Sequence, residues 1–195
     1  ICILLIAVLT TTIAWAGEKT LSDIDFHIST PADASDDSSD VYARLLVIDP
    51  LGNKTGYDPS MGVEVSHIPQ SGRFRERIGN IQSGELGIEE YSVGIGDPLA
   101  GEYILKIVGI NRTTKYTLGI RMADSAGNSR QPVFNGITSL GIISTYTITY
   151  DPTPGITPKV EKVVTIEDIK NDVNNAFNLG LIDNSGIQQS LFAKL

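Results

Sequence analysis

Four aspartates near the start of the chain could hold a metal ion. They are Asp33, Asp36, Asp37 and Asp40, within the segment that reads TPADASDDSSD. Ca²⁺ takes six to eight oxygen ligands, and carboxylates at this density can supply several of them. The segment has no D-x-[DN]-x-[DN]-G loop, so the sequence favours a solvated, serine-rich loop. We therefore expect no cofactor, and calcium is the one metal for which these residues are candidates.

A second, weaker set of calcium candidates is Asp49 with Asn53 and Asp58. The Asp, Pro and Gly residues in this part of the chain are already explained by turns, in which Pro fixes φ and Gly accepts a positive φ. The sequence therefore favours turns over a metal site here.

Three arginines form the one basic cluster of the chain. Arg73, Arg75 and Arg77 alternate with Phe74 and Glu76. Guanidinium groups bind carboxylates and other oxyanions through paired hydrogen bonds, so the cluster is a candidate ligand site for an anionic sugar, a carboxylate or a partner protein. The alternative is a set of solvated charges, because the glycine-interrupted segment 72–87 is predicted to be a long surface loop.

The residues needed for most enzyme chemistry are missing. Cys2 is the only cysteine, no G-x-S-x-G sequence is present, and the two histidines, His27 and His67, lack the spacing of a zinc site. The formal net charge of −8 opposes binding to nucleic acid. We therefore predict that the chain is not an enzyme and does not bind nucleic acid.

The N-terminal residues are typical of a signal peptide. Residues 1–16 carry no charge and end in Ala14-Trp15-Ala16, the small-x-small pattern that precedes signal-peptide cleavage. Neither an initiator Met nor a basic segment precedes them, so we expect a signal peptide that lacks its start. This predicts a secreted, extracellular or cell-surface protein with no membrane span in the mature chain. Cleavage would remove Cys2, and export without a disulfide favours a bacterial protein.

Residues 17–150 are predicted to form a mainly β domain. Apolar residues alternate with polar ones in several short runs, for example in segments 24–28, 116–122 and 142–150. Turn-forming residues separate the runs, and no helical period lies between them. This pattern predicts an antiparallel β-sandwich that is Ig-like or jelly-roll-like.

The period changes after Asp151. Residues 151–164 begin with three prolines in eight residues and are predicted to be a stiff, extended linker. Residues 165–195 have helical spacing, with a capping box of Thr165 and Asp168 and a helix end at Gly180. We predict a two-helix hairpin that is truncated at its end.

Two segments resemble known families. Leu46–Gly52, Thr55–Pro59 and Asp97–Tyr103 are similar to the turns of pre-peptidase C-terminal and bacterial Ig-like domains. Segment Ile169–Leu195, with Leu179-Gly180-Leu181-Ile182, Ser190-Leu191 and Ala193-Lys194-Leu195, resembles the first part of the helical repeat called FIVAR or FIMAH. These resemblances imply a β-sandwich and a partial helical repeat of extracellular bacterial proteins, where such modules accompany other domains without being catalytic.

These observations predict a non-catalytic secreted or cell-surface module for attachment, spacing or partner binding. Its partner would be a protein or a surface polymer. Two alternatives are an accessory part or fragment of a secreted hydrolase, with two facing carboxylates in a cleft, and a ligand binder with a pocket between its sheets.

Overall fold

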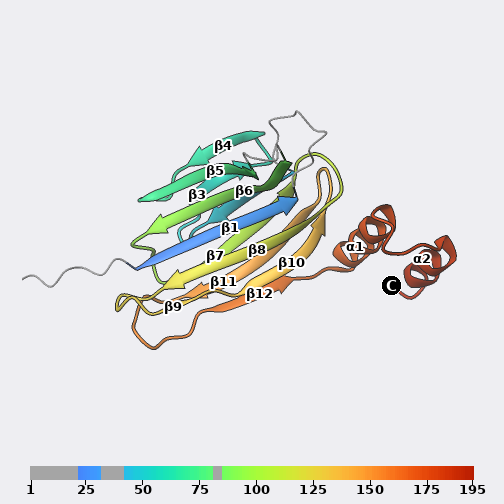
Figure 1. The fold of residues 1–195 in the computed structure, drawn as a ribbon. Helices are drawn as coiled ribbons and strands as arrows, with labels where there is room; N and C mark the ends of the chain where they lie inside the picture. The colour runs from blue at the N-terminus through green and yellow to red at the C-terminus, as the bar shows by residue number, and fades with distance from the viewer. Residues whose placement is uncertain (1–21, 32–41, 81–84) are drawn as a thin grey trace, which may run out of the picture.

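Two layers of strands face each other, and two helices lie at one end of them (Figure 1). A computed structural model of the chain describes residues 22–31, 42–80 and 85–195, and the side chains of all of these except 77–80 and 85–87. The architecture is mainly β, with two packed antiparallel sheets followed by two C-terminal helices. The predicted β-sandwich with a helical hairpin is therefore confirmed.

The first layer, sheet A, has six strands in the order β10-β8-β1-β6-β5, with β9 paired to β8 outside this path. Its strands are β1 (Asp23–Pro31), β5 (Ser71–Asn80), β6 (Glu85–Gly96), β8 (Thr114–Ala123), β9 (Ser129–Arg130) and β10 (Val133–Thr138). In the central strand β1, Ile24, Phe26 and Ile28 are buried while the residues between them face outward. The period-two pattern of the sequence thus produces one inner and one outer face.

The second layer, sheet B, has the order β12-β11-β7-β2-β3-β4. Its strands are β2 (Ala43–Ile48), β3 (Lys54–Asp58), β4 (Val63–Ser66), β7 (Gly101–Gly109), β11 (Ile143–Tyr150) and β12 (Lys159–Val163). The central strand β7 buries Leu105 and Ile107 completely. The inner faces of the two sheets together form one apolar core.

Tyrosines fill much of this core and bond their hydroxyls inside it. The buried tyrosines are Tyr42, Tyr91, Tyr103, Tyr116, Tyr146 and Tyr150. The Tyr150 hydroxyl donates to the carbonyl of Ala123 at 2.6 Å, and the Tyr103 hydroxyl donates to the carbonyl of Leu99 at 2.9 Å. Buried phenols need such partners, because an unbonded hydroxyl in an apolar core is costly.

The segment predicted as a linker contains a strand. Its prolines end at Pro158, and Lys159–Val163 then pairs with β11 as β12. Val160 packs against the core, whereas Lys159 and Glu161 are exposed and form an ion pair of 2.7 Å. The linker prediction is corrected for these five residues, because every backbone N–H is available again once the prolines end and an edge strand needs a partner on one side only.

The two helices are α1 (Ile166–Asn178) and α2 (Ser185–Phe192). Thr165 and Asp168 form the predicted capping box, with each side chain bonded to the backbone of the other. Gly180 has a φ of 69°, the left-handed conformation predicted for the helix end. Among the residues that the structure describes, neither helix is long and apolar enough to cross a membrane.

Candidate functional site

The arginine cluster lies on an edge strand and not in a loop. Segment 72–87 forms most of β5 and the start of β6, which pair as an antiparallel hairpin. The loop prediction is wrong because β5, which pairs on one side alone among the described strands, exposes charged side chains and so shows no apolar alternation. Arg73 and Arg75 are exposed. Arg77 belongs to the same strand, but its side chain lies outside the described part.

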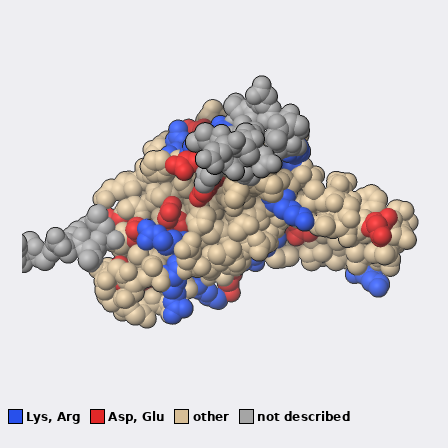
Figure 2. All heavy atoms as spheres, in the orientation of Figure 1, with Lys and Arg blue, Asp and Glu red and all other residues tan. Residues whose placement is uncertain are grey.

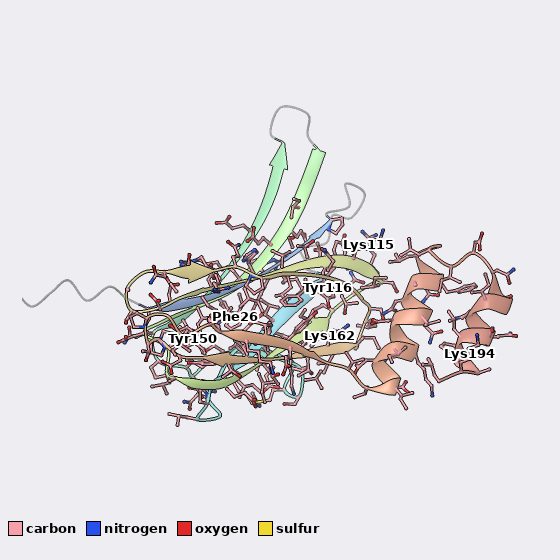
Figure 3. The ribbon with its side chains drawn as sticks, turned by 90° about the horizontal axis from the view of Figure 1, so that it is seen from below. Phe26, Lys115, Tyr116, Tyr150, Lys162 and Lys194 are labelled. Carbon is pink, nitrogen blue, oxygen red and sulfur yellow. The ribbon has the colours of Figure 1, made fainter. Side chains whose placement is uncertain are left out.

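Arg73 and Arg75 are on the same face of β5. In the register with β6 they lie opposite Val93 and Tyr91, two buried core residues. Facing residues of an antiparallel pair project to the same side, so both arginines lie on the core side of sheet A. Both nevertheless remain exposed, and the green β5–β6 hairpin to which they belong projects from the body of the sandwich (Figure 3).

Glu64 on β4 connects this hairpin to sheet B. Its Oε2 lies 3.6 Å from Nε of Arg73 and accepts a hydrogen bond of 2.6 Å from the Tyr91 hydroxyl. Its Oε1 lies 3.4 Å from Nη1 of Arg44 on β2. The Arg44 guanidinium also stacks over the ring of Tyr57, 4.8 Å from its centroid. These contacts hold the guanidiniums of Arg44 and Arg73 beside Glu64.

The electrostatic balance of this group is positive. Burial raises the pKa of Tyr91 far above its ordinary value, and its hydrogen bond to Glu64 raises it further, so the phenol stays a neutral donor. Arg44 and Arg73 share the carboxylate of Glu64, and Arg75 adds a third guanidinium on the same face of sheet A as Arg73. The buried Glu89 of β6 adds a second carboxylate on that face, so the three guanidiniums still outnumber the carboxylates. We name Arg44, Arg73 and Arg75 the arginine face. Its chemistry is suited to carboxylates and other oxyanions.

The four aspartates predicted as calcium ligands, Asp33, Asp36, Asp37 and Asp40, are not among the residues that the structure describes, so calcium there stays a prediction. Across 22–31, 42–80 and 85–195, no three His, Cys, Asp or Glu side chains are grouped as metal ligands.

The carboxylates of Asp49 and Asp58, the second set of candidate metal ligands, form hydrogen bonds within turns. The Asp49 carboxylate accepts hydrogen bonds from the backbone of Leu51 and from the backbone and side chain of Asn53. The Asp58 carboxylate accepts from Lys54 at 2.7 Å and from both the backbone and the hydroxyl of Ser60. Both carboxylates therefore serve the turn geometry that the sequence favours.

The turn at Asp58 leads to a pH prediction. Hydrogen bonds from Lys54 and Ser60 lower the pKa of Asp58 from its ordinary 3.8 to about 2. A lowered folded-state pKa stabilises the protein above the ordinary value, and this contribution is lost as the pH falls toward about 2. In Asp58→Asn we expect melting temperature to fall less between these two pH values than in the parent chain. Circular dichroism melts measure this, with the exposed Asp183→Asn as control; an unchanged slope in Asp58→Asn contradicts it.

The histidines do not form a catalytic pair. His27 lies on the outer face of sheet A, where its ring covers Gly119. His67 follows β4 and is exposed. Within the described residues, neither ring has a hydrogen-bonded serine or carboxylate that would make it a general base.

The structure offers two hollows on the outer face of sheet A. One has a volume of about 580 Å³ and lies over β1, β8 and β10, with Ile88, Lys115 and Ile137 among its lining residues. The other, about 170 Å³, lies between Phe74, Glu76, Glu90 and Ser92. Both are on the outside of the sandwich. A third hollow, about 400 Å³, lies at the edge between the two sheets, with Met122 and Phe134 of sheet A and Val160 of β12 among its lining residues, and it is the place where the ligand-binder alternative would have its pocket.

The hub residue Glu64 and its partner Arg44 were missed by the sequence analysis. They are 20 residues apart, and Tyr91 lies 27 residues beyond Glu64, so no local spacing could have indicated the group.

Comparison with known proteins assigns no function to the arginine face. Models of known protein families do not match the chain, and neither searches of curated proteins nor searches of solved structures find a match.

Proposed function

We propose that this chain is a non-catalytic binding module, exported from a bacterial cell, that holds an acidic protein partner on its arginine face. The observation that carries the proposal is the pair of exposed guanidiniums, Arg73 and Arg75, on one face of a projecting edge strand. The apolar N-terminal segment supports export, and the resemblance to secreted bacterial sandwich modules supports an attachment role.

The net negative charge of the whole chain limits where an acidic partner can bind. The formal net charge is −8, and Lys and Arg are interspersed with Asp and Glu on the face shown in Figure 2. A protein of this charge repels an acidic partner at long range, so contact needs local positive groups. Arg73 and Arg75 supply them on β5, which is the edge strand of sheet A.

The hydrolase alternative has one feature in its favour. Glu76 and Glu90 lie directly opposite each other in the β5–β6 register, beside the exposed ring of Phe74. Their hollow of about 170 Å³ is smaller than the ~300 to 1,000 Å³ of ordinary ligand pockets and lies on an open sheet surface. Two carboxylates without a cleft to exclude water do not favour glycoside hydrolysis, so we prefer the binding module.

Loss of the two exposed arginine charges should weaken binding to an acidic polypeptide. We expect the double variant Arg73→Gln/Arg75→Gln to bind fluorescent poly-L-glutamate about tenfold more weakly, because two charge-assisted contacts are removed. Fluorescence anisotropy at about 0.1 M ionic strength measures this, and further added salt should weaken the parent complex.

A matched control separates local charge from total charge. The variant Arg130→Gln/Lys194→Gln also removes two positive charges, from exposed positions on β9 and next to α2. We expect it to bind poly-L-glutamate within about twofold of the parent chain, since exposed charges more than ~10 Å from the ligand are screened. Equal losses in the two double variants would show that the arginine face has no special role, and the proposed function would fall.

A further inference from the structure

In the described part of the chain, the outer side of β5 is a long strand edge without a neighbouring strand. Sheet A ends at β5, and no strand in the described residues pairs with its other side. β5 has 10 residues, whereas the other edge strands β4, β10 and β12 have 4, 6 and 5. Unpaired backbone N–H and C=O groups along such an edge can accept a further strand from another molecule.

The side chains of β5 determine which strand can pair there. Arg73 and Arg75 are two residues apart on one face, which places their Cα atoms about 7 Å apart. Carboxylates at alternate positions of a paired strand have the same spacing and would lie directly opposite, at Cβ separations of about 5 Å. An extended acidic segment therefore matches the arginines in a way that a flexible acidic chain does not.

The opposite face of β5 presents an apolar group between the two arginines. Phe74 is 67% exposed, and it lies opposite Ser92 of β6. The Phe74 ring is not part of the hydrophobic core, so packing between the sheets does not account for it. In an added strand, the residue between two acidic positions would lie over Phe74, where a β-branched side chain would cover the ring.

A second copy of this chain is a poor occupant of this edge. Antiparallel pairing of two β5 strands centred on Arg75 would set Arg75 against Arg75 and Arg73 against Arg77. Like charges directly opposite each other destabilise a strand pair. Charged edge residues are a common protection against self-association, and here the same charges select an acidic partner.

We infer that an acidic segment of another protein adds to sheet A as an extra strand beside β5. Its carboxylates lie at alternate positions against Arg73 and Arg75, and the apolar residue between them covers Phe74. This inference rests on the proposed function, since it specifies how the arginine face holds its acidic partner. Backbone hydrogen bonds supply affinity, and the alternating side chains supply specificity.

The test uses peptides of equal charge that differ in their ability to pair. The first is a fluorescent peptide, Ser-Val-Asp-Val-Asp-Val-Ser, and the second has the same composition with its two aspartates adjacent. Two further versions of the first carry N-methyl groups, either on the aspartate amides or on the valine amides. Amides of successive residues point to opposite sides of a strand, so one of these two versions loses the hydrogen bonds to β5.

We expect the alternating peptide to bind the full chain at least tenfold more tightly than the peptide with adjacent aspartates. One N-methylated version should lose at least tenfold and the other much less. Equal affinity for all four peptides would overturn strand addition, while poly-L-glutamate binding that still depends on Arg73 and Arg75 would leave the proposed function standing. Loss of that dependence as well would remove both.

Discussion

Replacement of Gly109 by alanine is expected to destabilise the sandwich by about 3 kcal/mol. Gly109 ends β7, where its N–H donates to the carbonyl of Ile142 at 2.9 Å and its carbonyl accepts from Gly141 at 3.0 Å. An added Cβ would overlap the carbonyl of Ser139 and the hydroxyl of Thr138. The Ser139 carbonyl itself accepts a hydrogen bond from Ile142, so the backbone cannot move aside without breaking this turn.

The matched control is Gly94→Ala in β6. Gly94 is also a strand glycine, but its nearest neighbour for an added Cβ is Oδ1 of Asp25, at an ordinary contact distance of 3.8 Å. We expect the free energy of unfolding to change by less than about 0.5 kcal/mol there. Urea denaturation followed by circular dichroism measures both variants. Similar midpoints for the two would show that the turn after β7 is more adaptable than its hydrogen bonds indicate.

The parts of the fold that the sequence predicts are those with one buried face. β1, β8 and β11 place an apolar residue at every second position, and each runs through or beside the core. The sequence also predicted the capping box at Thr165 and the glycine at the helix end, because each depends only on residues close together in the chain. Local pattern and tertiary structure agree wherever burial dictates the residue type.

The candidate site follows no such local pattern. β5 alternates arginine with phenylalanine and glutamate, and it becomes a strand because β6 offers a pairing edge. Glu64 meets its partners through the order of the strands in the two sheets, which residue spacing does not encode. The sequence could therefore name Arg73 and Arg75 as candidates but could not show that Glu64 brings Arg73 together with Arg44.

Phe26 is buried and Phe74 is exposed, so replacement of Phe by Ala can be compared in two opposite environments. Phe26 is fully buried in β1 and lies between Val93 and Ile120 in the register of sheet A, whereas Phe74 is 67% exposed. We expect Phe26→Ala to lower the free energy of unfolding by about 3 to 5 kcal/mol, because it leaves a cavity at the centre of the sandwich. Phe74→Ala should change it by less than about 0.5 kcal/mol. Urea denaturation measures both.

The same pair of variants connects stability with binding. A large apolar side chain that is exposed and does not stabilise the fold is typical of a site where a partner binds. If Phe74 meets the side chain of an added strand, Phe74→Ala should weaken binding of the alternating peptide about threefold while its unfolding midpoint stays that of the parent chain. A stable Phe74→Ala variant with unchanged peptide affinity would show that the added strand gains nothing from this ring, and the contact with Phe74 would have to be withdrawn. A marked loss of stability would instead place Phe74 in the packing of the hairpin, and its exposure would no longer argue for a partner.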